Sequence, residues 1–255
     1  MLFIHKSLTI LLVLSAGLVS AVPADHSLSA MSGGAFKADG VLDEWSHIPF
    51  VAVTPKTGVL DARTAPPSSD QDLSFRFAVG HDADALYVAV VVTDDRTVAD
   101  TCKPGSISAP AWDDDAVEIF LDGNHNGTPD SRIDGGKELH FGGEFSLIAN
   151  GAAMSDFSGY PQSFGKLWNG ASNYAAVTNG TAQVMAYEFR MTWATMGLKN
   201  MPKIIGFNLS VQDDDDGGRR DHALYWTGNP QRPFSDESKF GTVTFDEPPQ
   251  SVSHP

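Results

Sequence analysis

The stretch AWDDDAVEIFLD, residues 111–122, carries the clearest fold signal in this chain. Val117, Ile119 and Leu121 would face one side of a β-strand, and Glu118 the other side. A tryptophan and three aspartates precede the strand, and a loop rich in Asp and Asn follows it. An aromatic ring, a fixed carboxylate and oxygen ligands would thus lie side by side. This arrangement favours the binding of a neutral polar ligand over bond-making chemistry.

Similar alternation recurs along the chain and predicts an all-β fold. Short alternating runs are separated by turns that contain Gly, Pro and Asp. The expected strands cover residues 73–79, 86–92, 117–121, 139–148, 184–191, 204–211, 223–226 and 241–245. No long window has a helical period, and residues 193–198 would form one turn at most. We therefore expect a single-domain antiparallel β-sandwich, jelly-roll-like or immunoglobulin-like.

The N-terminal residues predict export. Lys6 precedes an apolar run at residues 8–18, and small residues follow this run, as in a signal peptide. The run is too short for a membrane span, so the mature protein is expected to be secreted or periplasmic. The chain would then consist of a signal peptide (1–21), a flexible leader (22–35), the β domain (36–246) and a disordered tail (247–255).

Charge and cysteine content argue against several classes of function. The formal net charge of -15 disfavours nucleic acid, anionic membrane surfaces and acidic polysaccharides as partners. Cys102 is the single cysteine, so an internal disulfide framework is excluded. Nucleophile elbows, zinc-type His spacings and phosphate-binding Gly loops are missing from the sequence. Spacing alone pairs no two acids for acid–base catalysis, so a binding protein is favoured over an enzyme.

The loop after residue 121 has the composition of a calcium loop. Oxygen donors occupy alternate positions, and Gly127 permits a sharp turn. The expected ligands are the side chains of Asp122, Asn124, Asn126 and Asp130, with the backbone carbonyl of Thr128. Ile133 stands where an EF-hand has its bidentate Glu, so residues from elsewhere would have to complete the site. The alternative is a solvated turn rich in Asp and Asn.

A second acidic run, residues 213–221, lies between two expected strands. The run also contains Arg219 and Arg220, which would neutralise part of its charge. A hairpin loop kept soluble by its charge is the simplest interpretation. A second cation site, or acceptors that line a ligand cleft, are the alternatives.

Trp112 is the best candidate for contact with a ligand. It precedes three acids and follows Ala-Pro-Ala, so a core position is not expected. An exposed indole can stack on the C–H face of a pyranose, while nearby acids and amides bind the hydroxyl groups. Packing beneath a loop is the alternative. Trp168 also lies in a loop but lacks an acidic neighbour, and three tryptophans beside apolar residues should belong to the core: Trp45, Trp193 and Trp226.

Several motifs, in order along the chain, resemble the family 9 carbohydrate-binding modules, which are β-sandwich domains best known as appendages of xylanases. The motifs are DGVLDEW (39–45), ALYVAVVVTD (85–94), WDDDAVEIFLD (112–122), YEFRMTW (187–193), IGFN (205–208) and SKFG (238–241). The resemblance extends over residues 36–245, nearly the whole mature chain.

This resemblance implies a sugar held between two aromatic rings and a domain that carries structural calcium. Trp112 would be one ring, and Phe234 would replace the family's usual Trp as the other. Glu118 would accept a sugar hydroxyl, and Glu138 and His140 would stand where the family has a Gln and an Arg. The implied function is that of a secreted, non-catalytic carbohydrate-binding protein that supports polysaccharide catabolism. Its partner would be an oligosaccharide or polysaccharide, such as a plant cell-wall glycan.

Two alternative functions follow from other residues. A related sandwich could hold b-type haem non-covalently, with His140 and Met185 or Met191 as axial ligands. A glycoside hydrolase that uses two converging acids is the other alternative.

Overall fold

The structure is a computed structural model that describes residues 19–20, 26–103, 111–134, 137–156, 168, 172–179, 183–233 and 235–246. Side chains are described in these ranges except at 19–20, 131–134, 137–140 and 154–156. The expected tail and most of the expected signal peptide lie outside the described residues. The described part contains no helix that is long and apolar enough to span a membrane.

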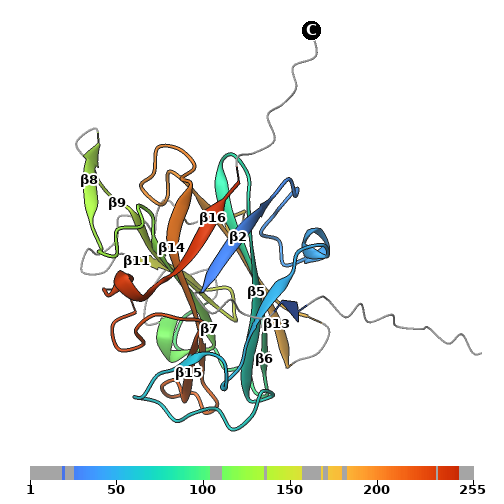
Figure 1. Cartoon of the computed structure of the whole chain (residues 1–255). Coiled ribbons are helices and arrows are strands. Elements are labelled where there is room, and N and C mark those ends of the chain that lie inside the picture. Colours follow the sequence, from blue (N-terminus) through green and yellow to red (C-terminus); the bar gives the residue numbers. More distant parts are fainter. Residues whose placement is uncertain are drawn as a thin grey trace, which may run out of the picture.

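One layer of the molecule, here called sheet A, contains the neighbouring strands β5, β6 and β13 (Figure 1). Its antiparallel order is β3–β5–β6–β13–β12. The bounds are β3 Phe50–Val53, β5 Leu73–His81, β6 Ala85–Asp94, β13 Val184–Thr192 and β12 Tyr174–Thr178, with β1 (Val19–Ser20) parallel to β3. β6 is almost wholly buried, which explains why its sequence is a near-continuous apolar run.

The other layer, sheet B, carries the stretch from which the fold was predicted. Its antiparallel order is β11–β10–β7–β14–β16, and β14 also pairs with β15, which pairs with β4. The bounds are β11 Ala153–Asp156, β10 Gly142–Ile148, β7 Ala116–Asp122, β14 Ile204–Asp213, β16 Gly241–Phe245, β15 His222–Tyr225 and β4 Val59–Leu60. β7 is therefore an interior strand with neighbours on both sides.

The two sheets are joined by β2, Ser27–Ser32. This strand runs parallel to β16 through its first residues and parallel to β5 through its last two, Met31 and Ser32. The expected flexible leader over residues 22–35 therefore contains a strand at the seam of the sandwich. The sequence did not indicate this strand, because its hydrogen-bonding partners come from residues about 50 and 215 positions further along.

The main core lies between the two sheets. Val117, Ile119 and Leu121 are at most 1% exposed and face it, as the alternation of the stretch predicted. Phe77 of sheet A stacks on Phe207 of sheet B, with ring centroids 5.8 Å apart. Trp45, Trp193 and Trp226 are also buried, as expected. The prediction of an antiparallel sandwich is thereby confirmed.

The outer face of sheet A is sealed by the segment that precedes β3. Trp45 belongs to the 3₁₀ turn η1 (Asp43–Trp45) and packs with Phe36 on this face. Beneath them, the Glu188 carboxylate accepts hydrogen bonds from the Trp45 indole N–H (2.7 Å) and from the backbone N–H groups of Gly40 (2.6 Å) and Asp39 (3.1 Å). Glu188 is fully buried and every one of its oxygens has a donor.

One expected strand divides into two elements with different partners. Residues 139–148 were expected to form a single strand, but β9 (Lys137–His140) and β10 are separate. β9 pairs with β8 (Ser131–Asp134) in a hairpin that projects at the upper left of Figure 1. The break falls at Gly142, whose φ of 110° is outside the range of ordinary strands. Residues 193–198 form hydrogen-bonded turns and no regular helix.

Candidate functional site

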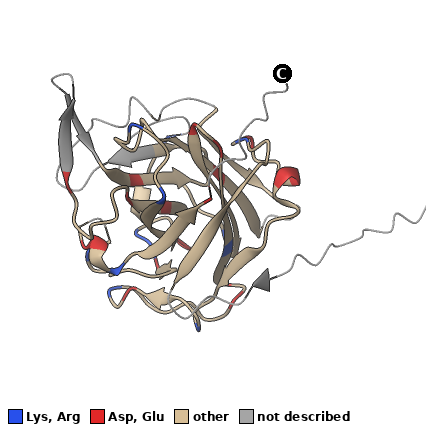
Figure 2. Ribbon diagram, turned by 45° about the horizontal axis from the view of Figure 1, so that its top comes forward, with Lys and Arg blue, Asp and Glu red and all other residues tan. Residues whose placement is uncertain are grey.

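A surface pocket of about 460 Å³ lies beside Trp112. Its walls come from three separate segments, the 63–64 turn, the 3₁₀ turn η2 (Ala111–Asp113) and the 214–221 loop. The lining residues are Arg63, Thr64, Trp112, Asp113, Arg219 and Arg220. Charged residues lie mainly in loops and turns of this kind, whereas most of each strand is uncharged (Figure 2). The pocket therefore contains more positive than negative side chains, although the whole protein is acidic.

Trp112 is held at the rim of this pocket by its neighbours. Ala111 is fully buried and fixes the turn, which leaves the indole of Trp112 41% exposed. Within the described residues, Trp112 is the one aromatic residue among the exposed large hydrophobic side chains. The expectation that Trp112 lies outside the core is confirmed. An indole in this position offers a ring face to a ligand.

Glu118 lies beneath the pocket on the outer face of sheet B. It is 3% exposed and stands between Ser146 of β10 and Ser210 of β14 in the register of the sheet. Gln212 Nε2 donates to its carboxylate at 2.7 Å, and the two serine hydroxyls lie at 3.5 and 3.4 Å. Burial raises the pKa of Glu118 above its usual range, and the charge of Arg220 opposes the rise.

A chain of hydrogen bonds connects Glu118 to the pocket wall. Gln212 accepts from Arg220 Nη1 through its Oε1 atom (2.8 Å), and Arg220 Nη2 donates to Asp61 at 3.1 Å. Arg63 also binds Asp61, with its Nη2 atom 2.6 Å from the carboxylate. Burial opposes ionisation of Asp61, but the hydrogen bonds and charges of the two arginines hold its pKa below the usual value. The two guanidinium groups are thus fixed in orientation at the pocket.

The expected calcium loop adopts the sharp turn that its sequence predicts. Gly127 has a φ of 78°, and the buried Asp122 carboxylate accepts the backbone N–H groups of Asn126 and Gly127. The side-chain amides of Asn124 and Asn126 donate to the two oxygens of Asp130, at 2.9 and 2.7 Å. The Asn126 Oδ1 atom accepts from the N–H and hydroxyl of Thr128. All five predicted ligands therefore lie in one loop.

Glu237 faces this loop from another part of the chain. It belongs to the 3₁₀ turn η3 (Glu237–Lys239), is 6% exposed, and its Oε2 atom is buried without a hydrogen-bond partner. Burial and the charges of Asp122 and Asp130 raise the pKa of Glu237 to about 8. The sequence analysis did not single out this residue, because more than a hundred positions separate it from the loop.

The remaining predicted sugar contacts are only partly placed by the structure. Glu138 and His140 belong to β9, whose side chains lie outside those described, and Phe234 lies outside the described residues. These three residues stay predictions. The strand next to β7 is β10, so Ser146 is the residue that the register sets beside Glu118. Sequence alone could not choose between β9 and β10, because this depends on which strand joins the sheet.

Three further candidates from the sequence belong to the core. Trp168 is 2% exposed, and its ring lies 5.1 Å from Phe145 and 6.0 Å from Phe189. Met185 and Met191, which were considered as haem ligands, pack in the main core between the sheets. The Met185 sulfur also accepts a hydrogen bond from the Thr178 hydroxyl.

The pocket arginines and Gln212 were not predicted as site residues. Arg219 and Arg220 were considered only as charges that neutralise the acidic run, and Arg63 carried no signal. The 63–64 turn and the 214–221 loop meet Trp112 only because β4 and β15 pair at this end of sheet B. That pairing is a long-range contact, and no local sequence pattern predicts it.

Comparison with known proteins gives a consistent group of relatives. The sequence model of the carbohydrate family 9 binding domain-like family matches residues 39–247. Exoglucanase XynX of Acetivibrio thermocellus is 26% identical over 216 residues, which are 84% of this chain and 17% of that protein. Endo-1,4-beta-xylanase A of Thermotoga neapolitana is 26% identical over 178 residues, 69% of this chain and 14% of that enzyme. The chain thus spans less than a fifth of the length of these relatives.

A solved structure shares the fold. It is a carbohydrate-binding module of family 9 from Caldicellulosiruptor kristjanssonii in complex with cellotriose, with a TM-score of 0.63 and 18% identity. The match covers 90% of this chain and 98% of that module. At this identity the likeness concerns the architecture, and the residues of the site have to be argued from the chain itself.

Proposed function

The chain belongs to the carbohydrate family 9 binding domain-like family, and from this premise we propose that it binds an oligosaccharide without chemical turnover in the pocket beside Trp112. The observation that carries the proposal is the 41% exposed indole at the rim of a pocket whose other walls carry three guanidinium groups.

The pocket offers the two kinds of contact that a sugar requires. The indole face of Trp112 stacks on the C–H face of a pyranose, which combines apolar burial with a favourable quadrupole. Arg63 and Arg220 line the space beside the ring with guanidinium groups that Asp61 and Gln212 hold in place, and exposed Arg219 supplies a third. Guanidinium N–H groups donate to hydroxyl oxygens in a rigid fork. Glu118 acts indirectly, since it fixes Gln212, which in turn accepts from Arg220.

The lining of the pocket favours binding over hydrolysis. Glycoside hydrolysis needs two carboxyl groups on opposite sides of one bond. Among the described residues, Asp113 is the one acid that lines the pocket, and Asp61 is occupied by Arg63 and Arg220. Small sugars bury few atoms and displace bound water, so we expect dissociation constants from about 1 μM to 1 mM.

The ligand class follows from the relatives. One structural neighbour holds cellotriose, and two relatives in sequence are named as an exoglucanase and a xylanase. A β-linked glycan of the plant cell wall is therefore the ligand that we propose. With the signal peptide expected from residues 1–21, the protein would act outside the cytoplasm, in the catabolism of polysaccharide.

Titration of the mature protein with cellotriose tests this proposal by calorimetry. Trp112→Ala is expected to weaken binding at least tenfold, because the stacking surface is removed. Val41→Ala is the matched control, since it removes another exposed hydrophobic side chain, from the outer face of sheet A, and is expected to bind as the wild type does. Equal affinity of Trp112→Ala and wild type would place the sugar elsewhere. If the wild type binds neither cellotriose nor xylotriose, the ligand class is wrong.

We also propose that the Asp122 loop holds a structural calcium ion. The family resemblance implies calcium, and the buried, unpartnered Glu237 Oε2 atom supplies a carboxylate ligand from outside the loop. The charges of Asp122 and Asp130 both raise the pKa of Glu237, so the three carboxyl groups are close enough to repel one another. Asn126 would exchange the hydrogen bonds that its Oδ1 atom accepts for the ion, and Asn124 Oδ1 and the Thr128 backbone carbonyl would contribute further oxygens. Calcium supplies charge compensation here and takes no part in chemistry.

Thermal unfolding with and without a calcium chelator tests the ion. We expect chelation to lower the wild-type Tm by about 5 °C, and added calcium to restore it. Glu237→Gln should lose most of this calcium response, whereas the control Glu44→Gln, in the half-exposed turn η1 of the other sheet, should keep it. A Tm that does not respond to chelation would make the loop an ordinary turn.

A further inference from the structure

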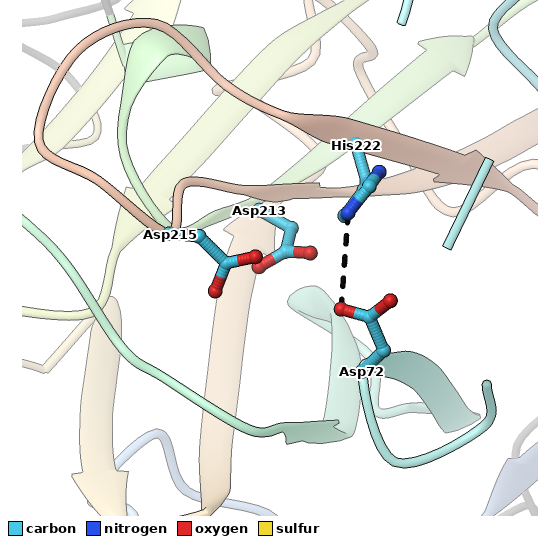
Figure 3. A group of neighbouring side chains, drawn as sticks. All are labelled: Asp72, Asp213, Asp215 and His222. Carbon is cyan, nitrogen blue, oxygen red and sulfur yellow. Dashed lines mark ion pairs between the residues drawn. The ribbon is translucent and has the colours of Figure 1, made fainter. Parts of the chain in front are cut away.

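A second group of ligand-type side chains lies apart from the calcium loop. Asp72, Asp213, Asp215 and His222 converge on one point (Figure 3), and their ligand atoms all lie within 4.8 Å of one another. Asp213 and His222 are direct partners in the β14–β15 hairpin. Asp72 arrives from sheet A, as the residue before β5. The cluster therefore connects the two sheets.

Asp213 is unusual within this group because its buried carboxylate lacks hydrogen-bond donors. Its side chain is fully buried, and neither carboxylate oxygen has a hydrogen-bond partner. A buried carboxylate without donors is costly, so such groups normally accept hydrogen bonds or bind a cation. Glu188, which is equally buried, shows the usual outcome with three donors. Asp213 instead directs bare oxygens into the cluster.

His222 is oriented as a ligand would be. Its Nδ1 atom lies 2.8 Å from the backbone carbonyl of Ala65. A carbonyl can only accept, so Nδ1 carries the proton, and the lone pair of the neutral imidazole is on Nε2. Nε2 lies 3.8 Å from Asp72 Oδ1, which is too long for a hydrogen bond. A backbone carbonyl that fixes one ring nitrogen while the other faces carboxylates is the usual support for a metal-binding histidine.

Asp72 is supported in the same way. Its Oδ2 atom accepts from the backbone N–H of Ser68, which leaves Oδ1 directed at His222. Donor atoms around a four-coordinate ion, each about 2.1 Å from the metal, lie about 3.4 Å apart. The present separations of up to 4.8 Å need only small side-chain movements to reach that geometry.

The charge of the cluster is uncompensated by protein groups. Arg220, which is on the same loop, pairs with Asp61 instead. In the described part of the chain, no Lys or Arg ion pair involves Asp72, Asp213 or Asp215. A bound dication would supply the missing positive charge.

We propose that Asp72, Asp213, Asp215 and His222 form a binding site for a divalent transition-metal ion of the zinc type. One imidazole with carboxylates suits zinc and its first-row neighbours, whereas calcium takes oxygen ligands alone. The ion would tie β5 of sheet A to the β14–β15 hairpin. It would also hold the loop that presents Arg219 and Arg220 to the pocket, but the site itself does not depend on sugar binding.

Asp213 also belongs to a neighbouring group with Asp94 and Asp115, which contains oxygen ligands only. This group is the competing position for an ion, since it shares the Asp213 carboxylate. Only the proposed site includes His222 as a ligand, so substitutions can distinguish which of the two positions holds the ion. Asp115→Asn removes a ligand from the competing group, and His222→Gln removes one from the proposed site.

Zinc titration of metal-free protein in excess calcium tests the proposal by calorimetry, with Co²⁺ absorption as a second readout. We expect one zinc ion per chain, which binds about 10- to 100-fold more weakly to His222→Gln and to Asp72→Asn. The Co²⁺ complex should lose its d–d absorption in both variants. His47→Gln removes an exposed histidine and is expected to bind zinc as the wild type does. Urea unfolding of each metal-free variant establishes that it is folded.

Three results would overturn the proposal. The first is wild-type zinc affinity in His222→Gln. The second is a loss of zinc affinity in His47→Gln as large as that in His222→Gln, because zinc would then bind non-specifically to histidines. The third is a loss of zinc affinity in Asp115→Asn while His222→Gln keeps the wild-type affinity. This result would place the ion in the competing group.

Discussion

Both sheets carry a buried glutamate on the outer face of an interior strand, and the two residues are surrounded differently. On sheet A, Glu188 is enclosed by fixed donors, which are one indole and two backbone N–H groups. On sheet B, Glu118 is surrounded by hydroxyl and amide groups that can rotate, and a hydrogen-bond chain leads from it to a pocket. The sealed face serves stability, and the adaptable face supports a site. Burial of an acid therefore does not by itself identify function.

The largest expected effect is that of Glu188→Gln on stability. The amide NH₂ must face either the Trp45 indole N–H or the backbone N–H groups of Asp39 and Gly40, and none of these can turn away. We expect the free energy of unfolding to fall by about 2 kcal/mol. Urea unfolding measures this change. An unchanged midpoint would show that the sealed face is as adaptable as the other.

A smaller effect is expected at the seam between the sheets when the pH falls. His81 ends β5 opposite Ser32 of β2, is fully buried, and its ring packs against Phe245. Burial holds the pKa of His81 below its usual value, although the charges of Asp82 and Asp246 oppose this. Below about pH 6.5 the His81 imidazole therefore binds a proton in the unfolded chain but not in the folded chain. The free energy of unfolding thus decreases as the pH falls.

The comparison of wild type with His81→Leu isolates this contribution. Between about pH 6.5 and 5.5, the wild type should lose about 1 kcal/mol more stability than the variant. Chemical unfolding at several pH values measures the difference. His47→Ala, at an exposed position, should keep the wild-type slope. Parallel slopes for wild type and His81→Leu would mean that the folded protein accepts the proton.

The smallest expected effect is that of Glu118→Gln, the counterpart of Glu188→Gln. The new amide oxygen can accept from Gln212, and the new amide group can donate to Ser146, whose hydroxyl rotates. Stability should change by less than about 1 kcal/mol, and cellotriose affinity by less than about threefold. A tenfold loss of affinity would instead make Glu118 a direct acceptor of a sugar hydroxyl, as the family resemblance implies.

The sequence analysis predicted the strands well because their signal is local. β5, β6, β7, β13, β14, β15 and β16 lie where alternation or apolar runs placed them. The expected strands did not include β1, β2, β3, β4, β8, β11 or β12, since each of these is defined by its pairing with a partner strand. The sequence also indicated Trp112 as exposed, because turn residues and acids surround it. It did not indicate Arg63, Gln212 or Glu237, which reach their sites through long-range pairing.

Local sequence by itself determined the all-β class, the core face of β7, the exposed tryptophan and the Asp122 turn. These features depend on side-chain alternation and on turn chemistry within a few residues. Only the tertiary structure decided which outer face is sealed, which strand lies beside Glu118, and which acids meet His222. Such choices depend on strand pairing across as many as 215 positions, where every pairing has to offset the entropy of closing a long loop.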